Sequence, residues 1–177
     1  MQRFNLLVGC PREREHAARS EVQYFVGDLL DDQGLVITGT PASGLLTCFT
    51  TIDPFLVVHR LFSFALESPY QFRFSTRFTP VECCVPSTID DIMAATERMK
   101  NKIGESESFR VTVRHRRTAL DSMSVVRSVA GLISQRVDLK KPDKTVWIEI
   151  VGDLTGVSIL VPEKDILSIV ALQGCKQ

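Results

Sequence analysis

The side chains with the clearest chemical capacity are cations that gather in the second half of the chain. Between residues 110 and 144 the sequence has nine lysines and arginines against three aspartates, a local net charge of +6. Residues 1–82 hold seven cations against nine anions. The nine cations of the basic window are Arg110, Arg114, Arg116, Arg117, Arg127, Arg136, Lys140, Lys141 and Lys144. Because Lys and Arg contacts to phosphates supply most sequence-independent affinity for nucleic acid, this window favours an anionic partner, with a solvated surface as the alternative.

A search for catalytic patterns finds few candidates. The chain has no GxGxxG or Walker phosphate loop, no HExxH pair and no GxSxG elbow. Of its three histidines, His16 and His59 lie in predicted helices, and His115 ends a predicted strand, where it could stack on RNA or fill a sheet edge. The five cysteines are scattered without a CxxC pair, whereas a zinc site needs ligands at short spacing. The sequence therefore predicts no catalytic residue, no cofactor and no metal site.

Composition narrows the class of protein further. The chain has 177 residues, of which 44% are hydrophobic and 24% charged, as in a soluble globular chain of one large domain or two small ones. Cations and anions both number 21, which excludes a uniformly basic protein that coats nucleic acid. No apolar run reaches the roughly 18 residues of a membrane helix, and Phe4–Cys10 is too short for a secretory signal. With an odd number of scattered cysteines, we expect reduced thiols and a cytoplasmic protein without a membrane partner.

The periodicity of the first 82 residues predicts the order β-α-β-β-α-β. One helix carries apolar residues at three-and-four spacing, and the other begins with Asp53 as N-cap and Pro54 at its first position. The predicted elements are a strand at Phe4–Val8, a helix over Arg12–Leu30, strands at Leu35–Thr38 and Leu45–Thr50, a helix ending at Ser68-Pro69, and a strand at Phe72–Val81. This order builds the ferredoxin-like split unit, a four-stranded antiparallel sheet with two helices on one face.

The second half alternates helices and strands again. A helix stripe runs from Ile89 to Ile103, and another runs from Met123 through Val129 to Val137, behind an N-cap at Asp121 or Ser122. Strands are predicted at Phe109–Arg116, Thr145–Val151 and Thr155–Val161, and Asp165–Ala171 favours a last strand over a helix. Strict alternation in Phe109–Arg116 puts the arginines at 110, 114 and 116 on one face. The cluster at 114–117 then lies just before a helix N-terminus, where backbone N–H groups also favour an anion.

The segment from Ser106 to Leu160 closely resembles the THUMP domain. The specific pieces are Gly104 before FRVTV, R-R-x-x-x-x-S after it, V-D-L-x-x-P-D over Val137–Asp143, and I-x-G-D-x-T-G-V-S over Ile150–Ser158. The run FNLLVGCPRERE, the S-G-L-L run and T-x-D-P-F over Thr51–Phe55 are similar to the front half of stand-alone, archaeal-type THUMP proteins. The resemblance implies an α+β chain, with an N-terminal ferredoxin-like domain at 1–82 and an α/β THUMP domain at 83–177.

In this family such a pair of domains binds tRNA and recognises its acceptor end, and it is usually fused to a catalytic domain. The sequence ends six residues past Ala171, so the resemblance implies a non-catalytic adaptor, similar to the THUMP adaptor of tRNA cytidine acetylation, with a separate tRNA-modifying enzyme as an open partner. The residues expected to contact RNA are Arg110, Arg114, Arg116, Arg117, Arg136, Lys140, Lys141 and Lys144, with Arg73 and Arg77 contributing from the first domain or only decorating a strand.

Two other functions stay open at this point. Cys83 or Cys84 could carry a persulfide in a sulfur-transfer enzyme, by analogy with sulfur-transferring relatives. Such a nucleophilic thiol needs an electropositive, partly exposed setting, whereas buried structural thiols are the alternative. The third reading is a protein-interaction adaptor in which RNA binding is secondary.

Overall fold

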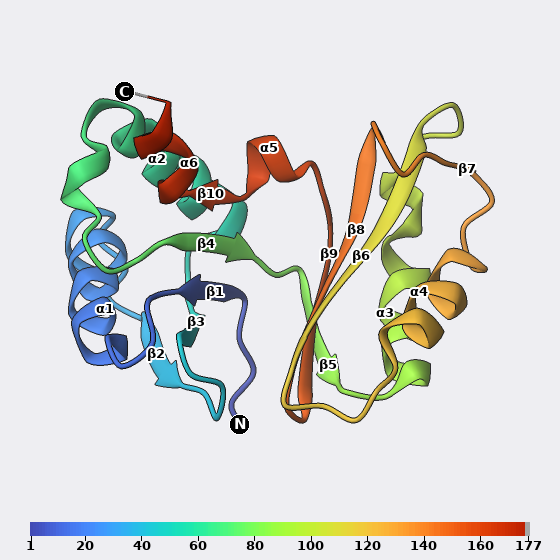
Figure 1. Ribbon diagram of the computed structural model, residues 1–177, viewed down its shortest axis with the longest axis horizontal. Coiled ribbons are helices and arrows are strands. Elements are labelled where there is room, and N and C mark those ends of the chain that lie inside the picture. The colour runs from blue at the N-terminus through green and yellow to red at the C-terminus, as the bar shows by residue number, and fades with distance from the viewer. Residues whose placement is uncertain (176–177) are drawn as a thin grey trace. The chain divides into compact units, whose positions relative to one another are not determined.

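The chain folds as two compact units, each with its own sheet and its own core (Figure 1). The structure is a computed structural model that describes residues 1–175. The first unit contains Gln2–Val81 together with the described residues from Glu163 onward. The second unit contains Met1 and Glu82–Pro162. The mixed α+β class predicted from the sequence is confirmed.

The first unit is an antiparallel sheet with strand order β10-β4-β1-β3-β2. Its strands are β1 (Leu6–Gly9), β2 (Val36–Gly39), β3 (Leu45–Phe49), β4 (Arg77–Pro80) and β10 (Leu167–Ser168), and its helical segments are α1 (Glu15–Val22), η1 (Gln23–Leu29), α2 (Pro54–Glu67), η2 (Pro69–Gln71) and α6 (Ile169–Gly174). Alternate sheet residues such as Leu6, Leu46 and Phe78 are buried in one core with Val22 of α1 and Leu61 of α2. The order β4-β1-β3-β2 is that of the ferredoxin-like split unit, and β10, which lies in the segment where the sequence favoured a last strand, adds a fifth strand.

Two boundaries in the first unit differ from the prediction. The helix expected from Arg12 begins at Glu15 and becomes π-helical from Gln23 onward. The strand expected over Phe72–Val81 is reduced to β4, Arg77–Pro80. The carboxylate of Glu21 accepts hydrogen bonds from the backbone N–H groups of three consecutive residues, Arg73, Phe74 and Ser75, at 2.6, 3.1 and 2.5 Å. Residues 73–75 are therefore hydrogen-bonded to Glu21 of α1 and do not extend the strand.

The second unit is a mixed sheet with strand order β5-β9-β8-β6-β7. Its strands are β5 (Cys83–Pro86), β6 (Ser108–Arg116), β7 (Arg136–Val137), β8 (Lys144–Val151) and β9 (Leu154–Leu160), and its helical segments are α3 (Ile89–Met99), η3 (Lys100–Lys102) and α4 (Ser122–Ala130). The short helix α5 (Pro162–Asp165) begins at the last residue of this unit and continues into the first. β6 runs parallel to β8 and β7, whereas β9 is antiparallel to β8 and β5. Helices α3 and α4 lie on the same side of the sheet (Figure 1), where Phe109, Val146 and Ile148 are buried with them.

Helix α4 is shorter than its predicted stripe. It ends at Ala130, and its buried residues are Val125 and Val129, while Met123 is 53% exposed. Asp121 caps the helix by accepting the N–H of Ser124, which sets the helical phase so that Met123 faces outward. Val137, predicted to end the core stripe, lies in β7 and is 52% exposed. Strands β5 and β7 were not predicted.

The C-terminal segment returns to the first unit. Leu167 and Ser168 pair with Phe78 and Arg77 of β4, after which α6 begins at Ile169. The strand predicted over Asp165–Ala171 is therefore confirmed at Leu167–Ser168 and wrong from Ile169 onward, where the chain is helical. The two compact units differ from the predicted domains, 1–82 and 83–177, in placing the residues from Glu163 onward with the first sheet.

Asp32 joins two loops inside the first unit. The residue is 2% exposed, and its carboxylate accepts four hydrogen bonds. The donors are the backbone N–H groups of Gly34 and Thr51 and the hydroxyls of Thr50 and Thr51, at 3.1, 3.0, 2.5 and 2.5 Å. Burial raises the pKa of Asp32, but these hydrogen bonds to the charged form outweigh it, and the net pKa is lowered.

Replacing Asp32 with asparagine is expected to lower the free energy of unfolding by about 2–3 kcal/mol at neutral pH, because an amide nitrogen then faces the threonine donors. A lowered folded-state pKa contributes stability above the unfolded pKa of about 4, and this stability is lost as the pH falls through the folded value. The difference from wild type should therefore shrink in acid, as chemical denaturation at several pH values can show. Asp31→Asn is the matched control, since Asp31 is exposed and asparagine tolerates its φ of 59°; an equal loss in both variants would contradict the argument.

Candidate nucleic-acid interface

Strand β6 carries the central arginines on the face of its sheet opposite the helices. Its parallel register sets Arg110 beside Thr145, Arg114 beside Glu149, and Arg116 beside Val151. Because side chains alternate along a strand, these residues share one face, and Phe109 and Ile148 belong to the other, buried one. The predicted alternation of this strand is confirmed. We call the side that bears Arg110, Thr112, Arg114 and Arg116 the arginine face.

Two residues of β8 complete the arginine face. The carboxylate of Glu149 accepts a hydrogen bond from the indole Nε1 of Trp147 at 3.0 Å. The Nε of Arg114 lies 3.9 Å from the same oxygen, and the side chains of Arg114 and Glu149 are 39% and 8% exposed. Burial raises the pKa of Glu149, and the Trp147 hydrogen bond and the charges of Arg114 and Arg116 offset this only in part. A buried acid thus lies directly beside the predicted RNA-binding arginines.

The end of β6 leads into a pocket. Arg117 adopts the left-handed conformation with a φ of 56°, and the N–H of Gly152 donates to the carbonyl of Arg116 at 2.9 Å. The pocket has a volume of about 620 Å³ and is lined by Pro86, Ser87, Thr88, Arg117, Thr118, Ala119, Leu120, Gly152 and Asp153. The guanidinium of Arg117 and the hydroxyls of Ser87, Thr88 and Thr118 could meet an anionic group here, whereas the exposed carboxylate of Asp153 would oppose it.

The helix N-termini beside this pocket are already capped by the protein. Thr88 accepts the N–H of Asp91 at the start of α3, and Asp121 accepts the N–H and hydroxyl of Ser124 at the start of α4. These hydrogen bonds to Ser124 lower the pKa of Asp121, which keeps it charged. The expectation that the helix N-terminus itself favours an anion is therefore corrected: an anion here would have to be held by arginine and hydroxyl groups.

The lysines lie at the other end of β6. Arg136 pairs in register with Ser108, and Lys144 pairs with Phe109. Six residues of extended strand, about 20 Å, separate Arg110 from Arg116. Lys140 and Lys141 are exposed in the loop after β7, and both donate their backbone N–H to Asp138 at 3.0 Å. The cations therefore form a line along β6 and not one compact patch.

Some predicted residues are engaged within the chain. The guanidinium of Arg110 donates to the carbonyl of Leu139 at 3.2 Å, which ties the lysine loop to β6. The ammonium of Lys144 lies 3.6 Å from the carboxylate of Glu107 and donates to the carbonyl of Lys102. Lys144 is therefore less available for a phosphate than the sequence suggested.

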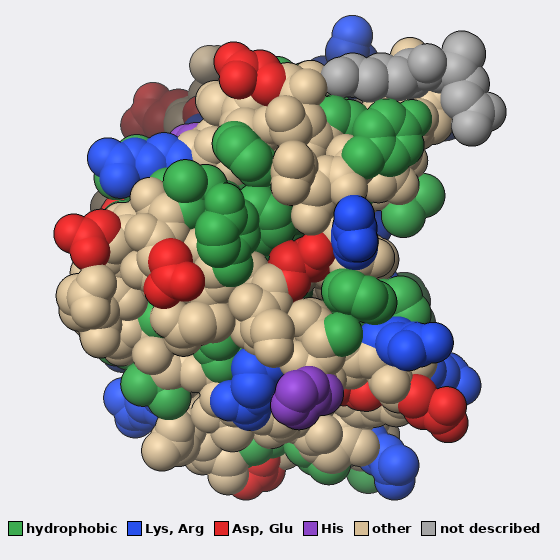
Figure 2. Space-filling model, turned by 90° about the vertical axis from the view of Figure 1, so that its left-hand side faces the viewer, with side chains coloured by type: hydrophobic (Ala, Val, Ile, Leu, Met, Phe, Trp, Pro, Cys, Tyr) green, Lys and Arg blue, Asp and Glu red, His purple; other side chains and the backbone are tan. Residues whose placement is uncertain are grey.

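Arg73 and Arg77 belong to the first unit. Arg73 is exposed in the segment bound by Glu21 and is not on a strand, contrary to the prediction, while Arg77 begins β4. Figure 2, which looks onto the side that carries α1, shows blue and red side chains interspersed around apolar ones. The cationic concentration predicted from the sequence is thus a property of the second unit.

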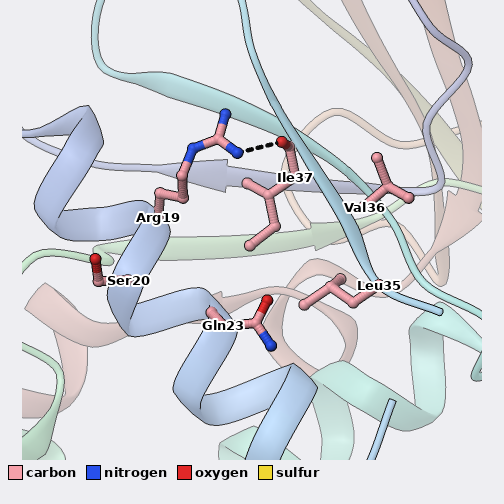
Figure 3. Close-up of a pocket in the computed structure, with 6 residues that line it drawn as sticks. All are labelled: Arg19, Ser20, Gln23, Leu35, Val36 and Ile37. Atoms are coloured by element: carbon pink, nitrogen blue, oxygen red, sulfur yellow. Dashed lines mark hydrogen bonds between the residues drawn. The ribbon is translucent and has the colours of Figure 1, made fainter. Parts of the chain in front are cut away.

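A second pocket, of about 540 Å³, lies in the first unit between α1 and the edge strand β2 (Figure 3). It is lined by Arg19, Ser20, Gln23, Leu35, Val36 and Ile37. The guanidinium of Arg19 donates to the carbonyl of Ile37 at 2.6 Å. This cation is committed to holding the strand, so the pocket offers less to an anion than the one at Arg117.

The paired cysteines lie in β5. Cys83 is opposite Val157 and Cys84 is opposite Gly156, and both are partly buried. The guanidinium Nη2 of Arg98 lies 3.3 Å from the sulfur of Cys83. Within residues 1–175 there is no group of three or more His, Cys, Asp or Glu side chains that could hold a metal ion, and no helix there has the length and apolar character to cross a membrane.

Trp147 and Glu149 are the site residues that sequence reasoning missed. The segment Lys144–Val151 contains the signal, since Glu149 is the one charged residue within the apolar run Val146–Val151 and Trp147 lies two positions before it on the same face of the strand. Their relation to the arginines depends on the register between β6 and β8, which the sequence does not state.

Comparison with known proteins identifies part of the chain. Residues 86–160 match the family model of the THUMP domain, so this domain is present as the motifs predicted. No curated protein shows significant similarity to the chain.

Several solved structures share the fold. PH1313 from Pyrococcus horikoshii Ot3 has 18% identity and a TM-score of 0.63, over 88% of this chain and 53% of that one. TrmN from Thermus thermophilus has 18% identity and a TM-score of 0.54, over 87% and 44%. A 4-thiouridine synthetase solved as an RNA complex with bound ATP has 12% identity and a TM-score of 0.55, over 94% and 42%. The chain spans about half or less of the length of these proteins, and identities this low show the fold alone.

Trp147 is the only tryptophan of the chain, so its emission is expected to report the charge of Glu149. Because burial raises the pKa of Glu149, the emission should titrate with a midpoint above the ordinary glutamate value, and Glu149→Gln should abolish the transition. A raised folded-state pKa also means that wild type loses stability relative to the Gln variant as the pH rises from the unfolded value through the folded one. Emission that stays constant between about pH 4 and pH 8 would contradict this account.

Proposed function

We propose that this chain, whose residues 86–160 form a THUMP domain, is a non-catalytic tRNA-binding protein that holds the acceptor end and assists a separate tRNA-modifying enzyme such as a cytidine acetyltransferase. A THUMP domain implies RNA binding, and one protein of similar fold is a 4-thiouridine synthetase solved with RNA. The observation that carries the proposal is the line of cations along β6, which ends at the Arg117 pocket within the matched segment.

The geometry suits a helical stem with a single-stranded end. RNA is recognised through phosphates, shape and stacking of unpaired bases, because side chains cannot read the deep major groove of an A-form helix. The arginine face, which extends about 20 Å from Arg110 to Arg116, and the lysine loop beside Arg110 would follow the stem phosphates. The pocket at Arg117 would take the terminal nucleotides, whose phosphates Arg116 and Arg117 would neutralise. The cytoplasm, where the five disulfide-free cysteines would stay reduced, is the proposed location.

Replacing Arg116 and Arg117 together with glutamate is expected to weaken tRNA binding at least about tenfold and to reduce the salt slope, because two phosphate contacts are lost. Binding is measured by electrophoretic shift and fluorescence anisotropy at several salt concentrations. The charge-matched control is Arg98→Glu with Arg127→Glu, two exposed cations on α3 and α4. Unchanged affinity at matched salt in a folded Arg116/Arg117 variant would refute the assignment.

The acceptor end is tested with tRNA that lacks its 3′ CCA. The full tRNA is expected to bind more tightly than the truncated one, and the difference should disappear in the Arg116/Arg117 variant if the pocket holds those nucleotides. Equal affinity for both RNAs would remove the acceptor-end part of the proposal and leave RNA binding in place. Co-purification of a partner enzyme before and after nuclease treatment separates an RNA-bridged adaptor from one that binds the enzyme directly.

The contact between Arg98 and the sulfur of Cys83 is the one observation that favours a cysteine-dependent enzyme, since a neighbouring guanidinium can stabilise a thiolate. For a non-catalytic protein, alkylation of Cys83 at neutral pH should be no faster than that of an ordinary exposed thiol and should not change in Arg98→Ala. Rapid alkylation that depends on Arg98 would support sulfur-transfer chemistry instead. Cys48 serves as an internal reference, because burial raises its pKa to about 12.

A further inference from the structure

Glu149 is an unusual residue for its place in the sheet. It lies in β8 with only 8% of its side chain exposed, and on the same face of this strand Thr145 and Val151 are 2% and 0% exposed. A buried carboxylate costs free energy unless it is well paired. Stability of the sheet alone gives no reason for an acid at this position.

The contacts of Glu149 suggest what it does. One carboxylate oxygen accepts the indole N–H of Trp147 at 3.0 Å, and the Nε of Arg114 lies 3.9 Å from that same oxygen. Arg114 is directly beside Glu149 in the parallel register, and its side chain is 39% exposed. The same carboxylate oxygen thus accepts the indole N–H and lies near a guanidinium that reaches solvent.

The exposure pattern of this sheet face agrees with such a role. On the side of the sheet that bears the arginines, Thr145 and Ser158 are 2% and 1% exposed, whereas Arg110 of β6 is exposed. Glu149 belongs to β8, which is buried on this face, and lies directly beside the more open strand β6. Arginine pairs with phosphate through a rigid planar fork, so its orientation matters as well as its charge.

We propose that Glu149 is a positioning residue for RNA binding, which orients the guanidinium of Arg114 on the arginine face so that it meets a backbone phosphate in a preset geometry. The inference rests on the proposed function and adds to it a residue that makes no contact with the RNA itself. Trp147 completes the arrangement by holding the carboxylate in place.

Charge counting and positioning predict opposite results for Glu149→Gln. The substitution keeps an oxygen that can accept the Trp147 N–H and raises the net charge by one, so electrostatics alone predicts tighter binding to tRNA. Positioning predicts binding weaker by about three- to tenfold. Glu97→Gln is the matched control, because it makes the same charge change at a side chain of α3 that is 53% exposed, and it should leave affinity unchanged or slightly raise it. Affinity of Glu149→Gln equal to or tighter than wild type would overturn the proposal.

A double-mutant cycle shows whether the effect passes through Arg114. Arg114→Ala should weaken binding, and Glu149→Gln should cause little further loss when Arg114 is already alanine. Full additivity of the two changes would exclude Arg114 as the group that Glu149 positions. Arg114→Lys gives a second measure that leaves Glu149 intact: it keeps the charge but loses the fork, so weaker binding is expected, and wild-type affinity would refute an orientation effect.

Thermal unfolding establishes that each variant is folded, and a Glu149→Gln variant that fails to fold leaves the decision to Arg114→Lys. The two proposals fail differently. If wild-type protein binds no tRNA, the proposed function fails and the positioning role fails with it. If wild type binds and the Arg116/Arg117 variant does not, while Glu149→Gln binds as well as wild type, only the positioning role fails.

Discussion

The parallel pairing of β6 with β8 is the constraint on which the second unit depends. Parallel neighbours cannot be joined by a tight turn, so the chain crosses one face of the sheet, here through α4. The crossover buries Val125 and Val129 against that face and leaves the other to the alternate residues of β6. A slip of one residue would move every side chain of the strand to the opposite face. The register that packs the core therefore also fixes the face on which the arginines lie.

Local patterns predicted what local interactions determine. The period-two alternation of β6 and the Asp53-Pro54 start of α2 both appear as expected, with Asp53 accepting the N–H groups of Phe55 and Leu56 at 2.8 and 3.2 Å. The failures lie where a distant residue competes with a local preference. Glu21 takes the N–H groups of Arg73 to Ser75 and shortens the strand, although it lies about fifty positions away in the sequence.

The candidate site was predictable in composition but not in arrangement. The cations of 110–144 can be counted in the sequence, but their division between two ends of β6, and the engagement of Lys144 by Glu107, follow from pairings between separate segments. The two missed residues show the same limit. The sequence displays Trp147 and Glu149 on one face of a strand, yet only the register with β6 puts Arg114 beside Glu149.

A buried carboxylate beside the arginine face weakens the attraction for a phosphate unless it also orients an arginine that binds the phosphate. Because Glu149 is buried, its charge acts through an effective dielectric constant of about 20, and at about 8 Å it would repel a bound phosphate by about 2 kcal/mol. A well-directed hydrogen bond to a charged group contributes about 1.5–3 kcal/mol, and much of that depends on the orientation of the guanidinium. Since Asp121 and Thr88 already cap the neighbouring helices, arginine must supply most of the attraction for an anion here. The positioning role proposed for Glu149 therefore requires that the orientation of Arg114 contribute at least as much binding free energy as this repulsion removes.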